Sequence, residues 1–178
     1  MPSLLSIDIS THTGWAYWRD TSKPPVCGTE RLPKVHDQED YGTRTWALMQ
    51  WLDQFIEDYG TPDAIALESP FIPMGMNNGK SATFNTTAQT IRLQISLAST
   101  IELVAKSHMI RCLEVATQSA KVALIGFGHR PKDKPNWDWK REMLIAATRA
   151  GYRVSNDHEA DAVAVGKVAA EHLWGITV

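Results

Sequence analysis

Residues 4–18, LLSIDISTHTGWAYW, place an aspartate inside an apolar run near the start of the chain. Apolar residues dominate LLSIDIS and no helical period fits them, which predicts a buried strand. The alternation in GWAYWRD predicts a second strand, with THTG as the turn between the two. A buried carboxylate without a partner costs several kcal/mol or gives up its charge. The position of Asp8 therefore needs an explanation.

The next patterns extend this pair of strands and then change period. PPVCGTERL, opened by prolines and closed by Pro33, predicts a third strand that completes an antiparallel meander. Apolar residues at i, i+3 and i+4 predict a helix over 38–59, which Gly60 and Pro62 end. The remaining patterns predict a strand over 63–68, a Pro- and Gly-rich loop over 69–80, a helix over 81–106, a strand over 109–115, and helices over 116–128, 137–151 and 157–174.

This order of elements defines a fold class. Three hairpin-linked strands followed by alternating strands and helices predict an α/β protein. Its five-stranded mixed sheet has three antiparallel strands, then parallel ones, with helices on both faces. That is the order of the ribonuclease H-like fold, and the length predicts a single domain over residues 1–178. Within the long helix we expect one apolar face, made of Phe84, Ala88, Ile91, Ile95, Ala98 and Ala105.

Composition limits the classes of function. Hydrophobic residues make up 43% and charged residues 21%, an ordinary balance for a soluble globular protein. No window approaches the roughly 18–20 apolar residues of a membrane helix, and the first residues lack a signal-peptide pattern, so we expect no membrane partner and a cytoplasmic location. Cys27 and Cys112 lie in unrelated contexts and are expected to be reduced, packed thiols.

Charge is distributed unevenly although the net charge is only −2. Residues 36–69 carry eight acids and one base, whereas residues 129–153 carry seven Lys or Arg and three acids. The second segment can present a positive surface to a polyanion such as nucleic acid. It can equally be a solvated loop and helix face, and charge alone leaves both interpretations open.

Four side chains form a candidate site. Asp8 lies in the first strand and Glu68 ends the fourth, and these strands are neighbours in the predicted topology. His158 and Asp161 lie three residues apart in the last helix and so share one face. Carboxylates from separate elements repel one another unless a cation lies between them, and oxygen ligands suit Mg²⁺ or Mn²⁺. Two such ions can activate water and stabilise the leaving oxygen of a phosphodiester.

Each of these residues also has a purely structural interpretation. Asp8 could face a turn, and Glu68 could be a strand end that meets solvent. The residues DHE (157–159) could be only a cap and N-terminal helix acids, which the helix dipole favours. Asp161 is harder to explain in this way, because it interrupts ADAVAV, whose small apolar residues predict a buried helix face.

Together these motifs resemble the RuvC family of Holliday-junction resolvases, especially its phage and prophage members, over about residues 4–170. SIDISTHTGWAYW resembles the strand–turn–strand opening of the family, in which an aspartate precedes a Thr-Gly pair; here these are Asp8, Thr13 and Gly14. The family often has Asp-Pro-Gly at this opening and a loop one residue longer. IALESPF resembles the second motif, an acid followed three residues later by an aromatic residue, which assigns Glu68 and Phe71.

The closing motif of the family resembles HEADAVAV. Its third site residue is Asp or His and its fourth is Asp three residues later, which assigns His158 and Asp161. Asp157 remains an alternative third ligand, because Asp157 and Asp161 are separated by four residues and would also share a helix face. The segment 128–139 is longer than in cellular members of the family, so the matching of residues there stays open.

The resemblance implies a homodimeric, Mg²⁺-dependent endodeoxyribonuclease that nicks symmetric strands of a four-way DNA junction. Asp8, Glu68, His158 and Asp161 would hold two ions per site, with Mn²⁺ able to substitute. Lys121 matches a catalytic lysine near the site, and Lys140 is the best match for a second one. By the same resemblance, the helix over 81–106 could form the dimer interface.

Several residues are expected to contact DNA. Phe71 follows Glu68 in a loop, where an exposed ring can stack on an unpaired base at the junction, or instead fold back onto the core. The segment HRPKDKPNWDWKR alternates basic residues with tryptophans. Basic side chains of this kind contact DNA phosphates, and such contacts determine the affinity and orientation of the protein on DNA. The expected DNA-binding residues are Phe71, Lys121, Arg130, Lys132, Lys134, Lys140 and Arg141.

Three other functions compete with junction resolution. A nuclease of the same fold could act on forks, flaps or structured RNA in general. An actin-like nucleotide-binding module is suggested by DISTHTG, but that architecture needs two such domains and further glycine-rich loops. A junction-binding protein without activity is disfavoured, because competent residue types occupy all four site positions.

Overall fold

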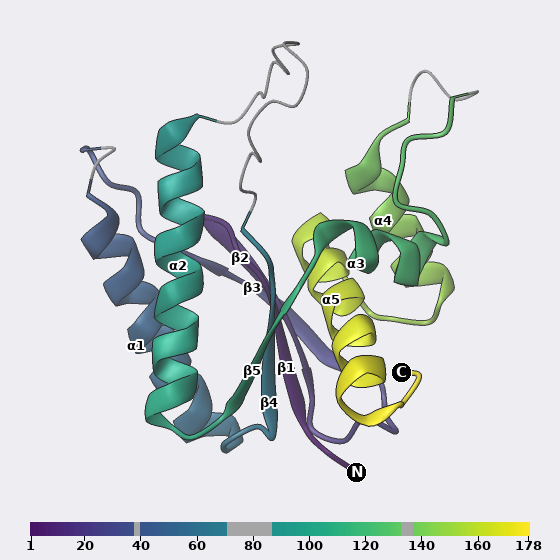
Figure 1. Ribbon diagram of the computed structural model, residues 1–178, viewed down its shortest axis with the longest axis horizontal. Coiled ribbons are helices and arrows are strands. Elements are labelled where there is room, and N and C mark those ends of the chain that lie inside the picture. Colours follow the sequence, from purple (N-terminus) through teal and green to yellow (C-terminus); the bar gives the residue numbers. More distant parts are fainter. Residues whose placement is uncertain (38–39, 71–86, 133–136) are drawn as a thin grey trace, which may run out of the picture.

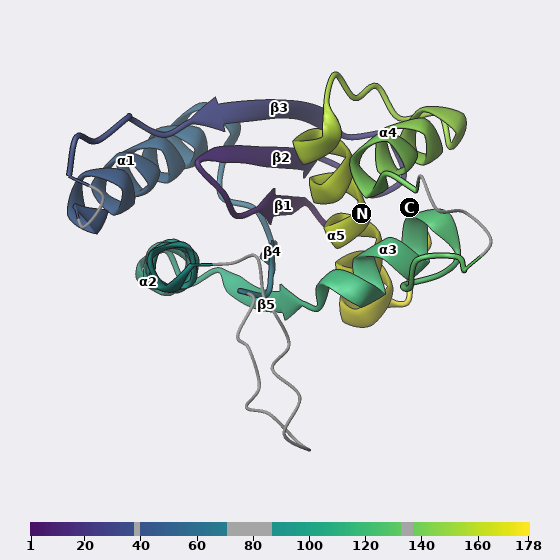
Figure 2. The same ribbon diagram turned by 90° about the horizontal axis from the view of Figure 1, so that it is seen from above.

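The computed structural model describes residues 1–37, 40–70, 87–132 and 137–178. Helices cover both faces of a central sheet, as Figure 1 shows from the front and Figure 2 from above. The strands are β1 (Leu4–Asp8), β2 (His12–Trp18), β3 (Val26–Arg31), β4 (Ala64–Glu68) and β5 (Arg111–Val115). The helices are α1 (Tyr41–Tyr59), α2 (Ala88–Ser107), α3 (Thr117–Ile125), α4 (Trp139–Arg149) and α5 (Asp157–Trp174).

The sheet confirms the predicted α/β class. Its strands lie in the order β3-β2-β1-β4-β5. β1 pairs antiparallel with β2 and parallel with β4, which in turn pairs parallel with β5. The register places Ile7 beside Leu67, so that the next residues, Asp8 and Glu68, come at the same edge of the sheet. The carboxyl ends of the parallel strands thus meet at one edge.

Several predicted boundaries were shifted by a few residues, and two of the differences lie at the β1–β2 turn and at the start of α2. The expected turn THTG is largely strand, because β2 begins at His12 and Gly14 pairs with Asp8. Ser10 makes the short turn possible, since its hydroxyl accepts a hydrogen bond from the backbone N–H of His12. Helix α2 begins at Ala88 rather than near 81, because the Thr87 side chain caps it by accepting from the N–H of Thr90. The loop and helix expected over 71–86 lie outside the described residues.

One core lies between the sheet and helices α1 and α2. It contains Leu5, Ile7, Tyr17, Ile65 and Leu67 from the strands and a larger set from the two helices. The expected face of α2 was wrong in part. Ala98 and Ala105 are buried as expected, but Ile95 is 41% exposed. The stripe that packs on the sheet also contains Leu93, Leu97, Ile101 and Val104. The helix carries two apolar stripes, and the sequence period alone does not tell which of them meets the sheet.

The second core lies under α5, which packs directly on β1 and β2. The expected burial of ADAVAV is confirmed, since Ala160 and residues 162–165 are buried. The hydroxyl of Ser6 donates to the carbonyl of Ala162 at 2.7 Å across this contact. A Cβ atom on Gly166 would lie 2.2 Å from the Trp18 ring, so only glycine lets the helix approach the strand this closely.

Two expectations from composition can be compared with the structure. Cys27 and Cys112 are free and partly buried, as expected for packed thiols. Burial raises the pKa of the Cys27 thiol to about 12 and that of Cys112 to about 11, so both are protonated at neutral pH. In the described parts of the chain, no helix is both long and apolar enough to cross a membrane.

Candidate active site

The last residue of β1 and the first turn of α5 meet at the edge of the sheet. Asp8 is 7% exposed, and its Oδ2 lies 3.0 Å from Nδ1 of His158. Gly14, paired with Asp8 on β2, makes this approach possible, because a Cβ atom there would lie 2.1 Å from the carbonyl oxygen of His158. The exposed ring of His12 stacks on His158 with centroids 5.9 Å apart. Asp8 thus has a polar partner from a helix 150 residues away in sequence.

Glu68 and Asp161 face a pocket beside this hydrogen bond. Glu68 ends β4, and Asp161 lies one turn beyond Asp157 on α5. Both line a pocket of about 190 Å³ between β4, α3, α4 and α5. Its other lining residues are Thr117, Ala120, Lys121, Trp139, Lys140 and Met143. The pocket therefore combines carboxylates with two lysines.

The carboxylates at this edge repel one another. Burial raises the pKa of Asp8 well above its usual value, and the charge of Glu68 raises it further. Burial also raises the pKa of Asp161, to about 8, with added contributions from Asp8, Glu68 and Asp157. Ionisation of these groups is therefore costly, and a cation among them would reduce that cost.

Lys140 and Asp157 form an ion pair at the mouth of the pocket. Lys140 Nζ lies 2.8 Å from Oδ2 of Asp157, and this contact raises the pKa of Lys140. Burial alone would raise the pKa of Asp157, but the hydrogen bond from Lys140 and the charge of His158 bring it below its usual value. Asp157 is thus engaged with α4, whereas His158 points to Asp8. The geometry favours His158 over Asp157 as the partner of the strand acids.

The donor set suits a hard divalent cation in its chemistry. β1, β4 and α5 contribute three carboxylates and one imidazole to this region, and oxygen-rich sets of this kind bind Mg²⁺ or Mn²⁺. As they stand, no three His, Cys, Asp or Glu side chains in the described ranges form a group that could hold a metal ion. The residues therefore fit the ion in type and charge, and binding would require their side chains to come together.

The described residues that are expected to bind DNA lie on α3, on α4 or in the connection between them. Arg130 and Lys132 are exposed in the connection between α3 and α4, and Arg141 is exposed on α4. Lys121 and Lys140 line the pocket itself. Phe71 and Lys134 lie outside the described residues, so their roles stay predictions.

Three aromatic rings pack together between the end of α3 and the start of α4, a contact that the sequence did not predict. The rings of Phe127, Trp137 and Trp139 have centroids 5.3–6.2 Å apart. Lys121 Nζ lies 4.6 Å from the centroid of the Trp139 ring. The signal in the sequence was the pair of tryptophans in WDW, but their partners depend on how α3 packs against α4.

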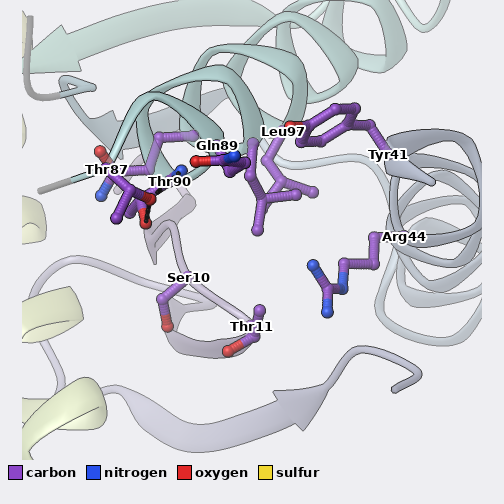
Figure 3. Close-up of a pocket in the computed structure, with 10 residues that line it drawn as sticks. Ser10, Thr11, Tyr41, Arg44, Thr87, Gln89, Thr90 and Leu97 are labelled. Atoms are coloured by element: carbon purple, nitrogen blue, oxygen red, sulfur yellow. Dashed lines mark hydrogen bonds between the residues drawn. The ribbon is translucent and has the colours of Figure 1, made fainter. Parts of the chain in front are cut away.

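A second pocket opens on the other side of the β1–β2 turn (Figure 3). It measures about 360 Å³ and lies between this turn and the first turns of α1 and α2. Arg44, Ser10, Thr11, Thr87 and Thr90 are among its lining residues, and the described lining contains no carboxylate. The described residues around this pocket therefore offer no carboxylate to a metal ion.

Comparison with solved structures supports the fold. The chain is similar to Thermus thermophilus RuvC, with a TM-score of 0.61 and 17% identity over 96% of each chain. It is also similar to T. thermophilus RuvC in complex with a Holliday junction substrate, with a TM-score of 0.65 and 18% identity over 93% of this chain and 90% of that one. The yeast mitochondrial Holliday junction resolvase Ydc2 matches with a TM-score of 0.50 and 13% identity, over 91% of this chain and 75% of its own.

At this level of identity the comparisons show a shared fold. They confirm the ribonuclease H-like arrangement that the order of elements predicts. No family model and no curated protein sequence matches the chain.

Proposed function

We propose that this protein is a metal-dependent endodeoxyribonuclease of the RuvC type that resolves four-way DNA junctions by paired nicking of symmetric strands. The observation that carries the proposal is the hydrogen bond between Asp8 and His158. It joins β1 to α5 at the edge where Glu68 and Asp161 line a pocket with two lysines. Similarity to RuvC structures over more than nine-tenths of the chain supports the same choice.

Asp8, Glu68, His158 and Asp161 would hold the metal, as two Mg²⁺ ions per site or Mn²⁺ in their place. When bound, such ions polarise a phosphodiester and make water a stronger nucleophile. Pairing between β1 and β4 places the carboxylates of Asp8 and Glu68 at the same edge of the sheet, and α5 would add His158 and Asp161 as the other two ligands. His158 is oriented by Asp8 and can also position the attacking water.

Lys121 and Lys140 would stabilise charge on the phosphate. Both line the pocket with Glu68 and Asp161, where an ammonium can reach a phosphate oxygen that gains charge during attack. Exposed Arg130, Lys132 and Arg141 lie nearby in sequence and would contact the phosphates of the flanking arms. Their contribution is to affinity and orientation.

A homodimer would place two such sites on the two symmetric strands of a junction. Exposed apolar residues of α2 support this arrangement: Ile95 is 41% and Leu103 is 66% exposed, and they lie eight residues apart on one face. A two-fold axis beside α2 would cover this stripe with the same stripe of the second copy.

Substitution of the carboxylates tests the proposed chemistry. We expect Asp8→Asn, Glu68→Gln and Asp161→Asn each to abolish cutting of a four-way junction in Mg²⁺ while junction binding changes less than about threefold. Each amide keeps the shape of the side chain and removes its charge. Glu57→Gln, at an exposed acid of α1, is the matched control and should cut normally. Retained cleavage in one of the three variants would remove that residue from the site.

A comparison of substrates tests specificity. We expect cleavage of a four-way junction to exceed cleavage of a Y-fork, a flap and a linear duplex of the same sequence. Equal rates on the branched substrates would replace junction resolution with general debranching. Cleavage of structured RNA in preference to DNA would overturn the proposed substrate.

A further inference from the structure

The ammonium of Lys121 rests on an aromatic ring at the wall of the acidic pocket. Lys121 lies on α3 and Trp139 begins α4, and Nζ lies 4.6 Å from the centroid of the indole ring. Both residues line the pocket together with Glu68 and Asp161. The ring of Phe127 lies near Trp139, with centroids 6.2 Å apart, and no cation–ring contact joins it to Lys121 among the described residues.

This position differs from the one that simple charge attraction would give. The ion pairs found within 4.0 Å in the described part of the chain join other residues, and none of them joins Lys121 to a carboxylate. Yet Lys121 is close enough that its charge acts to lower the pKa of Asp161. Opposite charges attract more strongly in a partly buried pocket than in water, so an unrestrained ammonium would move onto Glu68 or Asp161.

The face of an indole can compete with the carboxylates for such a cation. Its π electrons attract an ammonium within about 6 Å of the ring centroid, more strongly for tryptophan than for tyrosine or phenylalanine. At 4.6 Å the Trp139 ring is well within this range. Because α3 and α4 present these two residues to each other, the contact depends on the packing of the helices.

We propose that Trp139 is a positioning residue that holds the Lys121 ammonium away from Glu68 and Asp161. This inference rests on the proposed nuclease function. It leaves the two carboxylates available to a divalent cation and keeps the ammonium available to a phosphate oxygen. Without the ring, Lys121 would pair with the carboxylates and compete with the metal for them.

The test measures Mn²⁺ binding by calorimetry without DNA. In Trp139→Leu we expect Kd for Mn²⁺ to rise about three- to tenfold, because the released ammonium occupies the acids. Trp139→Phe should stay within about twofold of the original protein, since a benzene face also attracts a cation. Trp139→Leu combined with Lys121→Met should return Kd to the value of Lys121→Met alone. Phe127→Leu, which thins the same aromatic cluster, should leave Kd unchanged.

A second readout separates positioning from simple stabilisation. On a four-way junction, Trp139→Leu should lower kcat more than it changes KM, and higher Mn²⁺ should restore part of kcat. A purely structural role would lower the unfolding midpoint without this dependence on metal concentration. Should Trp139→Leu not fold, Lys121→Met alone still tests the idea. We expect it to change Kd for Mn²⁺ less than about twofold, because the ammonium is already held away from the acids.

Several results would overturn the inference. An unchanged Kd in Trp139→Leu, no recovery in the double variant, or a large gain in affinity in Lys121→Met would each show that the ring does not restrain Lys121. These outcomes differ from failure of the proposed function. That failure would appear as an absence of Mn²⁺ binding in the original protein, or as cutting that survives Asp8→Asn.

Discussion

Two acidic side chains at the sheet edge, Asp8 and Asp161, are costly to ionise. Burial and neighbouring carboxylates raise the pKa of both Asp8 and Asp161, the latter to about 8. Lys121 and Lys140 oppose this effect, but Lys121 rests on an indole ring and Lys140 is paired with Asp157. The free energy of unfolding of the metal-free protein should therefore depend on the protonation of these acids.

The stability of the metal-free protein should change with pH through Asp161. The folded protein binds the Asp161 proton more tightly than the unfolded chain, whose pKa is near 3.8. The free energy of unfolding in chelator should thus fall as pH rises from about 4 to about 8, by the order of a few kcal/mol, and then level off. Urea unfolding across this range measures it. Asp161→Asn should flatten the fall, and saturating Mg²⁺ should raise the stability of the original protein at pH 8 more than that of the variant.

Substitution of His158 should reduce the rate of junction cutting. Because His158 meets Asp8 at 3.0 Å, loss of the imidazole should remove both a ligand and an orienting contact. We expect His158→Ala to lower kcat for junction cutting by about 100-fold. His158→Asp, the other residue type at this position in the RuvC resemblance, should keep more activity than His158→Ala. Equal loss in both variants would argue against a ligand role.

At the scale of elements, the site depends on how closely α5 lies on the strands. Gly14 and Gly166 remove side chains at two points of that contact, one beside His158 and one beside Trp18. Ser6 adds a hydrogen bond to Ala162 between them. The helix is thus held at a fixed distance along its first half, and the two proposed ligands on it, His158 and Asp161, are fixed with it.

Gly14→Ala tests this dependence. The added Cβ would lie 2.1 Å from the His158 carbonyl oxygen, so the start of α5 must move away. We expect a loss of about 1–3 kcal/mol in urea unfolding and a loss of cutting larger than that destabilisation explains. Gly42→Ala is the matched control, because its Cβ would meet only Asp40 Oδ1, at 3.6 Å. Normal cutting by Gly14→Ala would show that the site tolerates displacement of α5.

The elements show what can be predicted from sequence. Period and turn residues predict each strand and helix of the described chain, and α5 has the predicted bounds of Asp157–Trp174. The start of β2 was missed because pairing of Gly14 with Asp8 is a contact between strands. Three separate motifs predict the four proposed ligands, and of these the structure pairs Asp8 with His158. The contacts of Lys121 and Lys140 could not be predicted, because they depend on packing between α3, α4 and α5.

At the scale of the whole molecule, the outer stripe of α2 leads to a prediction about assembly. We expect a dimer in solution, and we expect Leu103→Glu to raise its Kd by at least about tenfold, because a charge would be buried at the interface. Analytical ultracentrifugation measures this change. Val122→Glu, at a residue 49% exposed on α3, is the matched control.

Cleavage by the monomeric variant then tests the paired reaction. Leu103→Glu should still nick one strand of a junction at a protein concentration below the new Kd, but it should release fewer fully resolved products. A variant that stays dimeric, or a monomer that resolves junctions as well as the original protein, would contradict the proposed interface.

The register between β1 and β4 also determines which changes of length the chain can tolerate. A substitution leaves the backbone ladder in place, so that many sequences can share these strands, as they do at 17–18% identity. Insertion or deletion of one residue within Leu4–Asp8 or Ala64–Glu68 would instead turn the following side chains to the opposite face of the sheet. Length variation should therefore accumulate in connections such as residues 19–25 and be excluded from these two strands.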